Sequence, residues 1–140
     1  MSEATDPNEQ VIDQFRAGGG KVGGPFEGFP LVLVHHTGAK SGIERVNPLV
    51  YQRLGDDSIA IFASKGGALT NPDWYHNLVA NPNASIEIGT EQYDVTARVA
   101  TDDERRRIWD AQKAAFPNFA EYEATSGGRE IPVVVLDKVT

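Results

Sequence analysis

Apolar and polar residues alternate with a period of two along much of the chain, and short turn sequences separate the alternating stretches. Alternation or short apolar runs predict six strands, over residues 31–37, 46–53, 58–63, 84–88, 92–100 and 131–136. Glycine and aspartate in the intervening turns favour hairpin connections. Six short strands without strand–helix–strand units predict a closed antiparallel sheet, not a Rossmann fold.

Two helices are predicted in the first half of the chain. Helical spacing of apolar residues predicts one over residues 7–17, ended by Gly18. Asn71 as the N-cap and Pro72 as the first helical residue predict a second over residues 72–79.

Two further helices are predicted before the last strand. The capping-box pattern Thr101–Glu104 starts one that runs to about residue 115. Ile108, Ala111 and Ala115 would form its buried face. Pro117 ends this helix, and Asn118 can cap a short one after it.

Length and composition are those of one globular domain with one core. The chain has 140 residues, of which 40% are hydrophobic and 24% are charged. No apolar run approaches the roughly 20 residues that a membrane-spanning helix needs, and the polar, acidic start lacks a signal-peptide pattern. We therefore expect no integral membrane segment and a cytoplasmic location.

Several classes of chemistry are disfavoured. The absence of cysteine excludes disulfides, thiolate metal sites and cysteine nucleophiles. His35 and His36 point to opposite faces of a strand, so they and His76 predict no metal site. Ser64 lies in no G-x-S-x-G elbow, and the net charge of −7 argues against general nucleic-acid binding. Catalysis would then depend on a bound cofactor or on other side chains.

Two glycine-containing turns carry cations suited to an anionic ligand. Lys40 and Ser41 lie in the first, with Arg45 shortly after it, and Lys65 precedes Gly66 in the second. The second turn leads into the helix at residues 72–79, whose free N–H groups and dipole favour a nearby anion. Together these elements predict a phosphate-binding site.

Four ordered motifs carry a resemblance to a known family: T-G-x-K-S-G, R-V-N-P-L, A-S-K-G-G and N-P-x-W-Y-x-N-L. The chain resembles the deazaflavin (coenzyme F420)-dependent nitroreductases and quinone reductases of actinobacteria, from about Gly18 to Leu136. The resemblance implies a mostly β fold with flanking helices. This would be a six-stranded antiparallel split β-barrel of the FMN-binding-like kind over residues 18–140, after a helical segment over residues 1–17. It implies hydride transfer from reduced F420 to a quinone, enone or nitroaromatic acceptor.

The resemblance also implies residue roles. Cofactor contacts would come from Ala39, Lys40, Ser41, Arg45, Val46, Asn47, Pro48, Phe62, Ala63, Ser64, Lys65, Asp73, Trp74, Tyr75, His76 and Asn77. Substrate contacts would come from Ser64, Phe116, Phe119 and Tyr122. Tyrosines near these last positions help deliver a proton in the family. Phe116 and Phe119 lack a hydroxyl, which leaves Ser64, Tyr122 or water as the proton source.

Two positions qualify the comparison. The family usually has a basic residue where this chain has Ala39, and Arg45 could supply the missing cation. Trp74 and Tyr75, judged without the motif, are more typical of core residues than of ligand contacts.

Three alternatives to an F420-dependent enzyme stay open at this level. They are an FMN-binding split-barrel oxidoreductase, a noncatalytic deazaflavin carrier, and a barrel that sequesters small anionic molecules. The expected partner is a small electron acceptor. By analogy with other split barrels, the chain could also form a homodimer.

Replacement of Lys65 by alanine tests the phosphate-site hypothesis. Loss of its cation should raise the dissociation constant for F420 at least tenfold, about 1.4 kcal/mol. Fluorescence titration measures this constant. An unchanged constant would remove Lys65 from the site.

Overall fold

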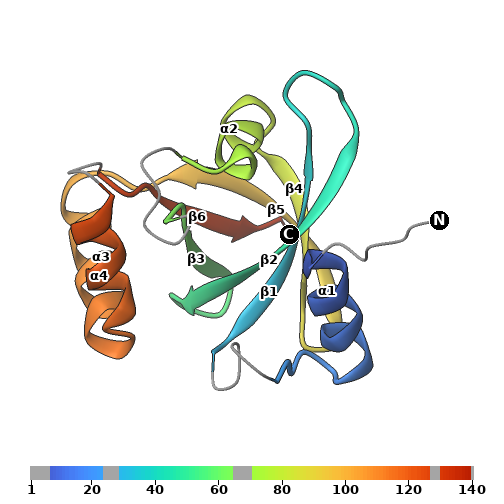
Figure 1. Ribbon diagram of the computed structural model, residues 1–140. Coiled ribbons are helices and arrows are strands. Elements are labelled where there is room, and N and C mark those ends of the chain that lie inside the picture. Colours follow the sequence, from blue (N-terminus) through green and yellow to red (C-terminus); the bar gives the residue numbers. More distant parts are fainter. Residues whose placement is uncertain (1–6, 24–28, 65–70, 127–129, 140) are drawn as a thin grey trace.

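Six strands form a closed barrel in the order β1-β2-β3-β6-β5-β4, and each neighbouring pair is antiparallel (Figure 1). The computed structural model describes residues 7–23, 29–64, 71–126 and 130–139. The elements are α1 (Pro7–Ala17), β1 (Leu31–Thr37), β2 (Glu44–Arg53), β3 (Ser58–Phe62), α2 (Asp73–Ala80), β4 (Asn83–Ile88), β5 (Glu91–Val99), α3 (Asp102–Ala115), α4 (Asn118–Thr125) and β6 (Val133–Lys138). The predicted six-stranded antiparallel barrel with flanking helices is confirmed.

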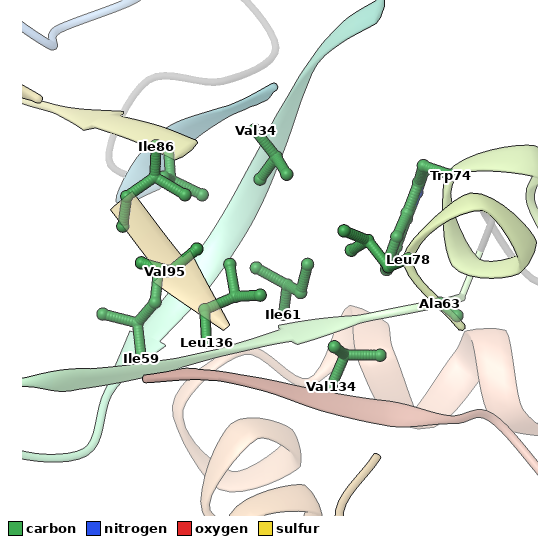
Figure 2. Close-up of a cluster of buried hydrophobic side chains, with 11 residues drawn as sticks. Val34, Ile59, Ile61, Ala63, Trp74, Leu78, Ile86, Val95, Val134 and Leu136 are labelled. Atoms are coloured by element: carbon green, nitrogen blue, oxygen red, sulfur yellow. The ribbon is translucent and has the colours of Figure 1, made fainter. Parts of the chain in front are cut away.

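Aliphatic side chains fill the interior of the barrel. Because side chains alternate along a strand, Ile59 and Ile61 of β3 join the inner cluster while Ala60 and Phe62 join an outer one. Trp74 and Leu78 of α2 reach into the inner cluster near Ile61 (Figure 2). The interior is therefore a packed core, and a large ligand must bind elsewhere.

Helices cover two parts of the outer barrel surface. α3 and α4 pack against the outer side chains of β3 and β6, at the left of Figure 1. α1 packs against β1 through Phe15, which is 1% exposed and contacts Leu31 and Leu33. α1 also contacts β2, where Val46 and Val50 pack against the Phe15 cluster.

β2 stays beside β3 for only a short distance. Three residue pairs join them, from Tyr51↔Ile61 to Arg53↔Ile59, whereas β2 pairs with β1 from Glu44 to Val50. Within the described ranges, this first part of β2 has no strand on its other edge. Pro48 lies there and fits an edge because it has no backbone N–H to donate. The barrel is thus split along β2.

Three helix starts differ in detail from the predictions. Pro72 is the N-cap of α2, one residue later than expected, and Pro117 is the N-cap of α4 in place of Asn118. Thr101 is the N-cap of α3 as predicted, but its side chain makes no capping hydrogen bond. The Glu104 carboxylate accepts two hydrogen bonds from Arg98 instead, and this bidentate ion pair replaces the capping box.

The prediction of the buried face of α3 was also wrong in part. Ile108 is buried as predicted, but its companions are Trp109 and Gln112, while Ala111 and Ala115 are exposed. Gln112 is only 1% exposed, and its Oε1 accepts a hydrogen bond from Gln52. A hydrophobicity pattern assigns glutamine to the surface, even where it is buried and hydrogen-bonded. The predicted buried face of α3 was therefore displaced from the observed one.

No described helix combines the length and the hydropathy that crossing a membrane requires.

A matched pair of isoleucine substitutions tests the packed interior. Ile61 is fully buried in the barrel and Ile43 is 59% exposed beside the β1–β2 turn. Ile61→Ala should lower the free energy of unfolding by about 2–5 kcal/mol, and Ile43→Ala by less than about 0.5 kcal/mol. Urea denaturation measures both, and equal effects would contradict a filled barrel.

Candidate functional site

A cavity of about 1880 Å³ opens along the unpaired edge of β2. It exceeds the roughly 300–1,000 Å³ of ordinary small-molecule pockets and has room for a large cofactor with a second molecule. Its lining comes from α1, β1, the β1–β2 turn, β2, the end of β3, α2 and α4. The lining residues are Glu9, Ile12, Phe29, His36, Ala39, Lys40, Ser41, Glu44, Arg45, Val46, Asn47, Pro48, Leu49, Val50, Phe62, Ser64, Pro72, Asp73, Trp74, His76, Asn77, Asn118, Phe119 and Tyr122.

The β1–β2 turn is held in a tight conformation that presents Lys40 to the cavity. Gly42 has φ of +70°, which favours glycine, and a Cβ at Gly38 would lie 2.4 Å from Ser41 Oγ. That oxygen accepts a hydrogen bond from the Ile43 N–H at 3.2 Å. The glycines and serine of T-G-x-K-S-G therefore shape the turn, and the exposed Lys40 is left to face a ligand.

A chain of buried hydrogen bonds ties this turn to α2, β1 and β2. The Ala39 N–H donates to Asn77 Oδ1 at 2.8 Å, and Asn77 Nδ2 lies 3.1 Å from His36 Nδ1. His36 Nε2 lies 2.7 Å from Asn47 Oδ1. His36 and Asn77, in the middle of the network, are 2% and 8% exposed, whereas Asn47 is half-buried and Ala39 is exposed at its two ends. It ties α2, through Asn77, to the β1–β2 turn.

His36 belongs to this network as a neutral imidazole. Burial lowers its pKa below 6.5, the nearby Arg45 charge acts in the same direction, and the hydrogen bond to Asn47 opposes them. His35, the preceding residue, points to the opposite face, where it lies 2.7 Å from Glu44 Oε2 and 2.5 Å from Glu87 Oε2. As predicted, the two adjacent histidines have opposite surroundings.

Positive charge gathers at the turn end of the cavity. Lys40 and Arg45 are exposed, and within the described ranges neither forms an ion pair with an acidic side chain. The start of α2 lines the same end, with Pro72 and Asp73. Two unpaired cations and a helix N-terminus make an anion-binding end, which Asp73 and Glu44 partly offset.

Aromatic side chains surround the opposite end. Phe62 packs edge-on against Phe119 with centroids 5.6 Å apart, and Phe119 contacts Tyr122 in the same way at 5.3 Å. The Asn118 Nδ2 group donates to the Tyr122 hydroxyl oxygen at 3.1 Å. An apolar aromatic wall with one hydroxyl suits a planar, weakly polar molecule.

Most residues expected to contact cofactor or substrate line this cavity. Those that line it are Ala39, Lys40, Ser41, Arg45, Val46, Asn47, Pro48, Phe62, Ser64, Asp73, Trp74, His76, Asn77, Phe119 and Tyr122.

Three expected residues lie elsewhere, and a fourth lies outside the described residues. Ala63 belongs to the barrel core, and Tyr75 packs against that core and against the His76 ring. Phe116 stacks on Phe29 with centroids 4.9 Å apart. The hypothesis for Lys65 falls on a residue that the structure does not describe.

The sequence reasoning missed His36 as a cavity residue. It follows Val32 and Val34 by steps of two, and the inward direction of those valines assigns His36 to the interior. The antiparallel register pairs His36 with Arg45, and Asn47, two residues further along β2, lies diagonally across from His36 on the same face. Strand alternation was the signal that could have found it.

No grouping of three metal-binding side chains occurs in the described part of the chain.

Comparisons with known proteins give a consistent result. The model of the F420H(2)-dependent quinone reductase family matches residues 8–138. An F420H(2)-dependent quinone reductase of Mycobacterium tuberculosis (strain ATCC 25618 / H37Rv) is 38% identical over 128 residues, 89% of this chain and 85% of that protein.

Two solved structures share the fold and more than a third of the sequence. An F420-H2 dependent reductase, FDR-A, superposes with a TM-score of 0.69 at 39% identity, covering 77% of this chain and 94% of that one. A chain described as a domain-swapped dimer gives a TM-score of 0.71 at 36% identity, covering 92% of each.

Proposed function

Because the chain belongs to the F420H(2)-dependent quinone reductase family, we propose that the cavity along β2 is where its reaction takes place. The protein is an oxidoreductase that uses reduced coenzyme F420 to reduce a quinone-like acceptor. The observation that carries the proposal is the separation of cationic and aromatic residues around the cavity. Lys40 and Arg45 line it from the β1–β2 turn and the start of β2, and Phe119 and Tyr122 line it from α4, on the opposite side of the molecule in Figure 1, with Phe62 packed against Phe119.

The residues present fit a long cofactor with an anionic tail. Within the described ranges Lys40 and Arg45 form no ion pair with an acidic side chain, so they would hold the phosphate and the tail carboxylates. Ser41 adds a hydroxyl and the first turn of α2 adds its dipole. Trp74 and Phe62, both 5% exposed, would bound the ring system.

The residues around the cavity would hold and shield reduced F420, which when bound would supply a hydride for an electrophilic carbon of the acceptor. The edge of β2, with Val46, Pro48 and Val50, would bound one side of the cavity. Phe119 and Tyr122 of α4 would keep the acceptor against the ring and exclude water. Such alignment needs no nucleophile, which agrees with a chain that has no cysteine.

We propose Tyr122 as the residue that delivers a proton. Its oxygen accepts the hydrogen bond from Asn118, so its own O–H can donate to an acceptor in the cavity. Reduction of a quinone carbonyl places charge on an oxygen, and a donor near that oxygen stabilises it. Tyr122 is therefore the proposed proton donor, while Ser64 borders the same cavity and would contact the acceptor.

Replacement of Tyr122 by phenylalanine tests both the reaction and the donor. Wild-type apo-protein mixed anaerobically with reduced F420 and menadione should regenerate the absorbance of oxidised F420. Tyr122→Phe should lower kcat about 100-fold, because it removes a general acid while keeping the ring. The dissociation constant for F420 should not change.

Tyr93→Phe is the matched control. Tyr93 packs against the barrel core beneath Lys138, whose Nζ lies 4.6 Å from the ring centroid. It should leave kcat unchanged. Absence of turnover with several quinones, together with tight F420 binding, would favour a carrier, and binding of FMN alone would contradict the cofactor assignment at this site. An unchanged kcat in Tyr122→Phe would exclude Tyr122 as the donor.

We further propose that the protein forms homodimers and resides in the cytoplasm. Support for dimers comes from the relative at 36% identity that is described as a domain-swapped dimer. Light scattering after size-exclusion chromatography should give about twice the chain mass of 15.2 kDa. A monomer at micromolar concentration would contradict this proposal, and fractionation of cells followed by immunodetection tests the location.

A further inference from the structure

A backbone N–H at one end of the buried network determines the direction of every hydrogen bond in it. The Ala39 N–H can only donate, so Asn77 must face it with Oδ1. Asn77 then offers its NH₂ group to His36, which must accept at Nδ1. His36 carries its proton on Nε2 and donates it to Asn47 Oδ1.

The last member of the chain faces the ligand. Asn47 lines the cavity, and its oxygen is occupied by His36. Its NH₂ group is accordingly the part of the carboxamide left for a bound molecule. Without His36, that carboxamide could rotate and offer either its oxygen or its nitrogen.

We propose that His36 is a positioning residue, which orients the Asn47 carboxamide so that an NH₂ donor meets an oxygen acceptor of the bound cofactor. This inference rests on the proposed use of the cavity for F420. His36 itself need not touch the cofactor, because it acts through Asn47. Because each hydrogen bond in the network has a fixed direction, Asn47 presents its NH₂ group to the ligand. The site is therefore selective for an acceptor beside Asn47, since a donor there would face another donor.

The arrangement makes cofactor affinity depend on the protonation of His36. A proton added at Nδ1 would face the Asn77 NH₂ group, and Asn77 cannot reverse without placing its own NH₂ against the Ala39 N–H. Protonated His36 therefore breaks the chain. Since its folded pKa lies below 6.5, the network is intact above that value and is lost as the pH falls through the folded pKa.

Other charged groups near His36 define the controls. Arg45 is its register partner on β2, His35 precedes it on the opposite face, and Glu44 lies at the start of β2. On the β1–β2 turn and α2, Lys40, Asp73 and His76 line the same cavity. Glu9 of α1 borders this cavity as well. A comparison of variants at fixed pH separates the contribution of His36 from theirs.

The direct test is an NMR titration of the His36 imidazole with and without F420. Nitrogen shifts should show the proton on Nε2, and saturating F420 should lower the His36 pKa by at least one unit. Linkage requires this shift when the neutral form binds the cofactor at least tenfold more tightly. The measurement uses the wild-type protein and does not depend on whether a variant folds.

Dissociation constants of three variants complete the test. In wild type, the dissociation constant for F420 should rise as the pH falls from 7.5 through the folded His36 pKa. His36→Gln should flatten this dependence to what the cofactor's own groups and other side chains contribute. His35→Gln, on the opposite face, should keep the wild-type dependence. Asn47→Asp, which replaces the NH₂ donor by an acceptor, should weaken binding at least tenfold at pH 7.5.

The outcomes separate this inference from the proposed function. If wild type binds F420 tightly but the His36 pKa does not move, the positioning role is wrong and the proposed function stands. The same conclusion follows if Asn47→Asp binds F420 as tightly as wild type. If wild type binds no F420, both proposals are wrong.

Discussion

The early separation of β2 from β3 is the constraint on which the rest of the structure depends. Three paired residues join the two strands, and the first part of β2 then pairs only with β1 among the described strands. The barrel interior is filled by side chains such as Ile61, so it has no room for a cofactor. The split instead exposes the edge of β2 along a cavity between α1, α2 and α4. The position of the site therefore follows from the point at which the pairing of β2 with β3 ends.

A polar network, buried at its centre, then determines which hydrogen-bonding groups face this cavity. Burial of polar groups costs free energy unless each is hydrogen-bonded, and Ala39, Asn77, His36 and Asn47 satisfy one another in sequence. The hydrogen-bonded chain links the turn bearing Lys40 to α2 through Asn77. This turn and the start of α2 form the anion-binding end. Electrostatics and packing therefore act at different ends of the cavity, with cations near the turn and aromatic rings near α4.

Strand positions were predictable because alternation reports directly which face of a strand is buried. The same rule assigns His36 to the interior once Val32 and Val34 are placed there. Helix ends were less predictable, since Glu104 could cap its own helix or pair with Arg98, and only the fold brings Arg98 close. Gln112 illustrates the same limit, because its hydrogen-bond partner Gln52 is 60 residues away. The motif residues Tyr75 and Ala63 lie beside cavity residues in sequence but face the core, which spacing in a motif does not reveal.

The chain has two tryptophans, which permit one direct test of where the cofactor binds. Trp74 lines the cavity, whereas Trp109 packs behind Phe62 and donates its indole N–H to Glu123 at 2.7 Å. Indole N–H signals should be followed by two-dimensional NMR during titration with F420. Our account predicts a saturable shift of the Trp74 signal that clearly exceeds any change at Trp109. Saturable F420 binding that leaves the Trp74 signal in place would contradict the assignment of this cavity.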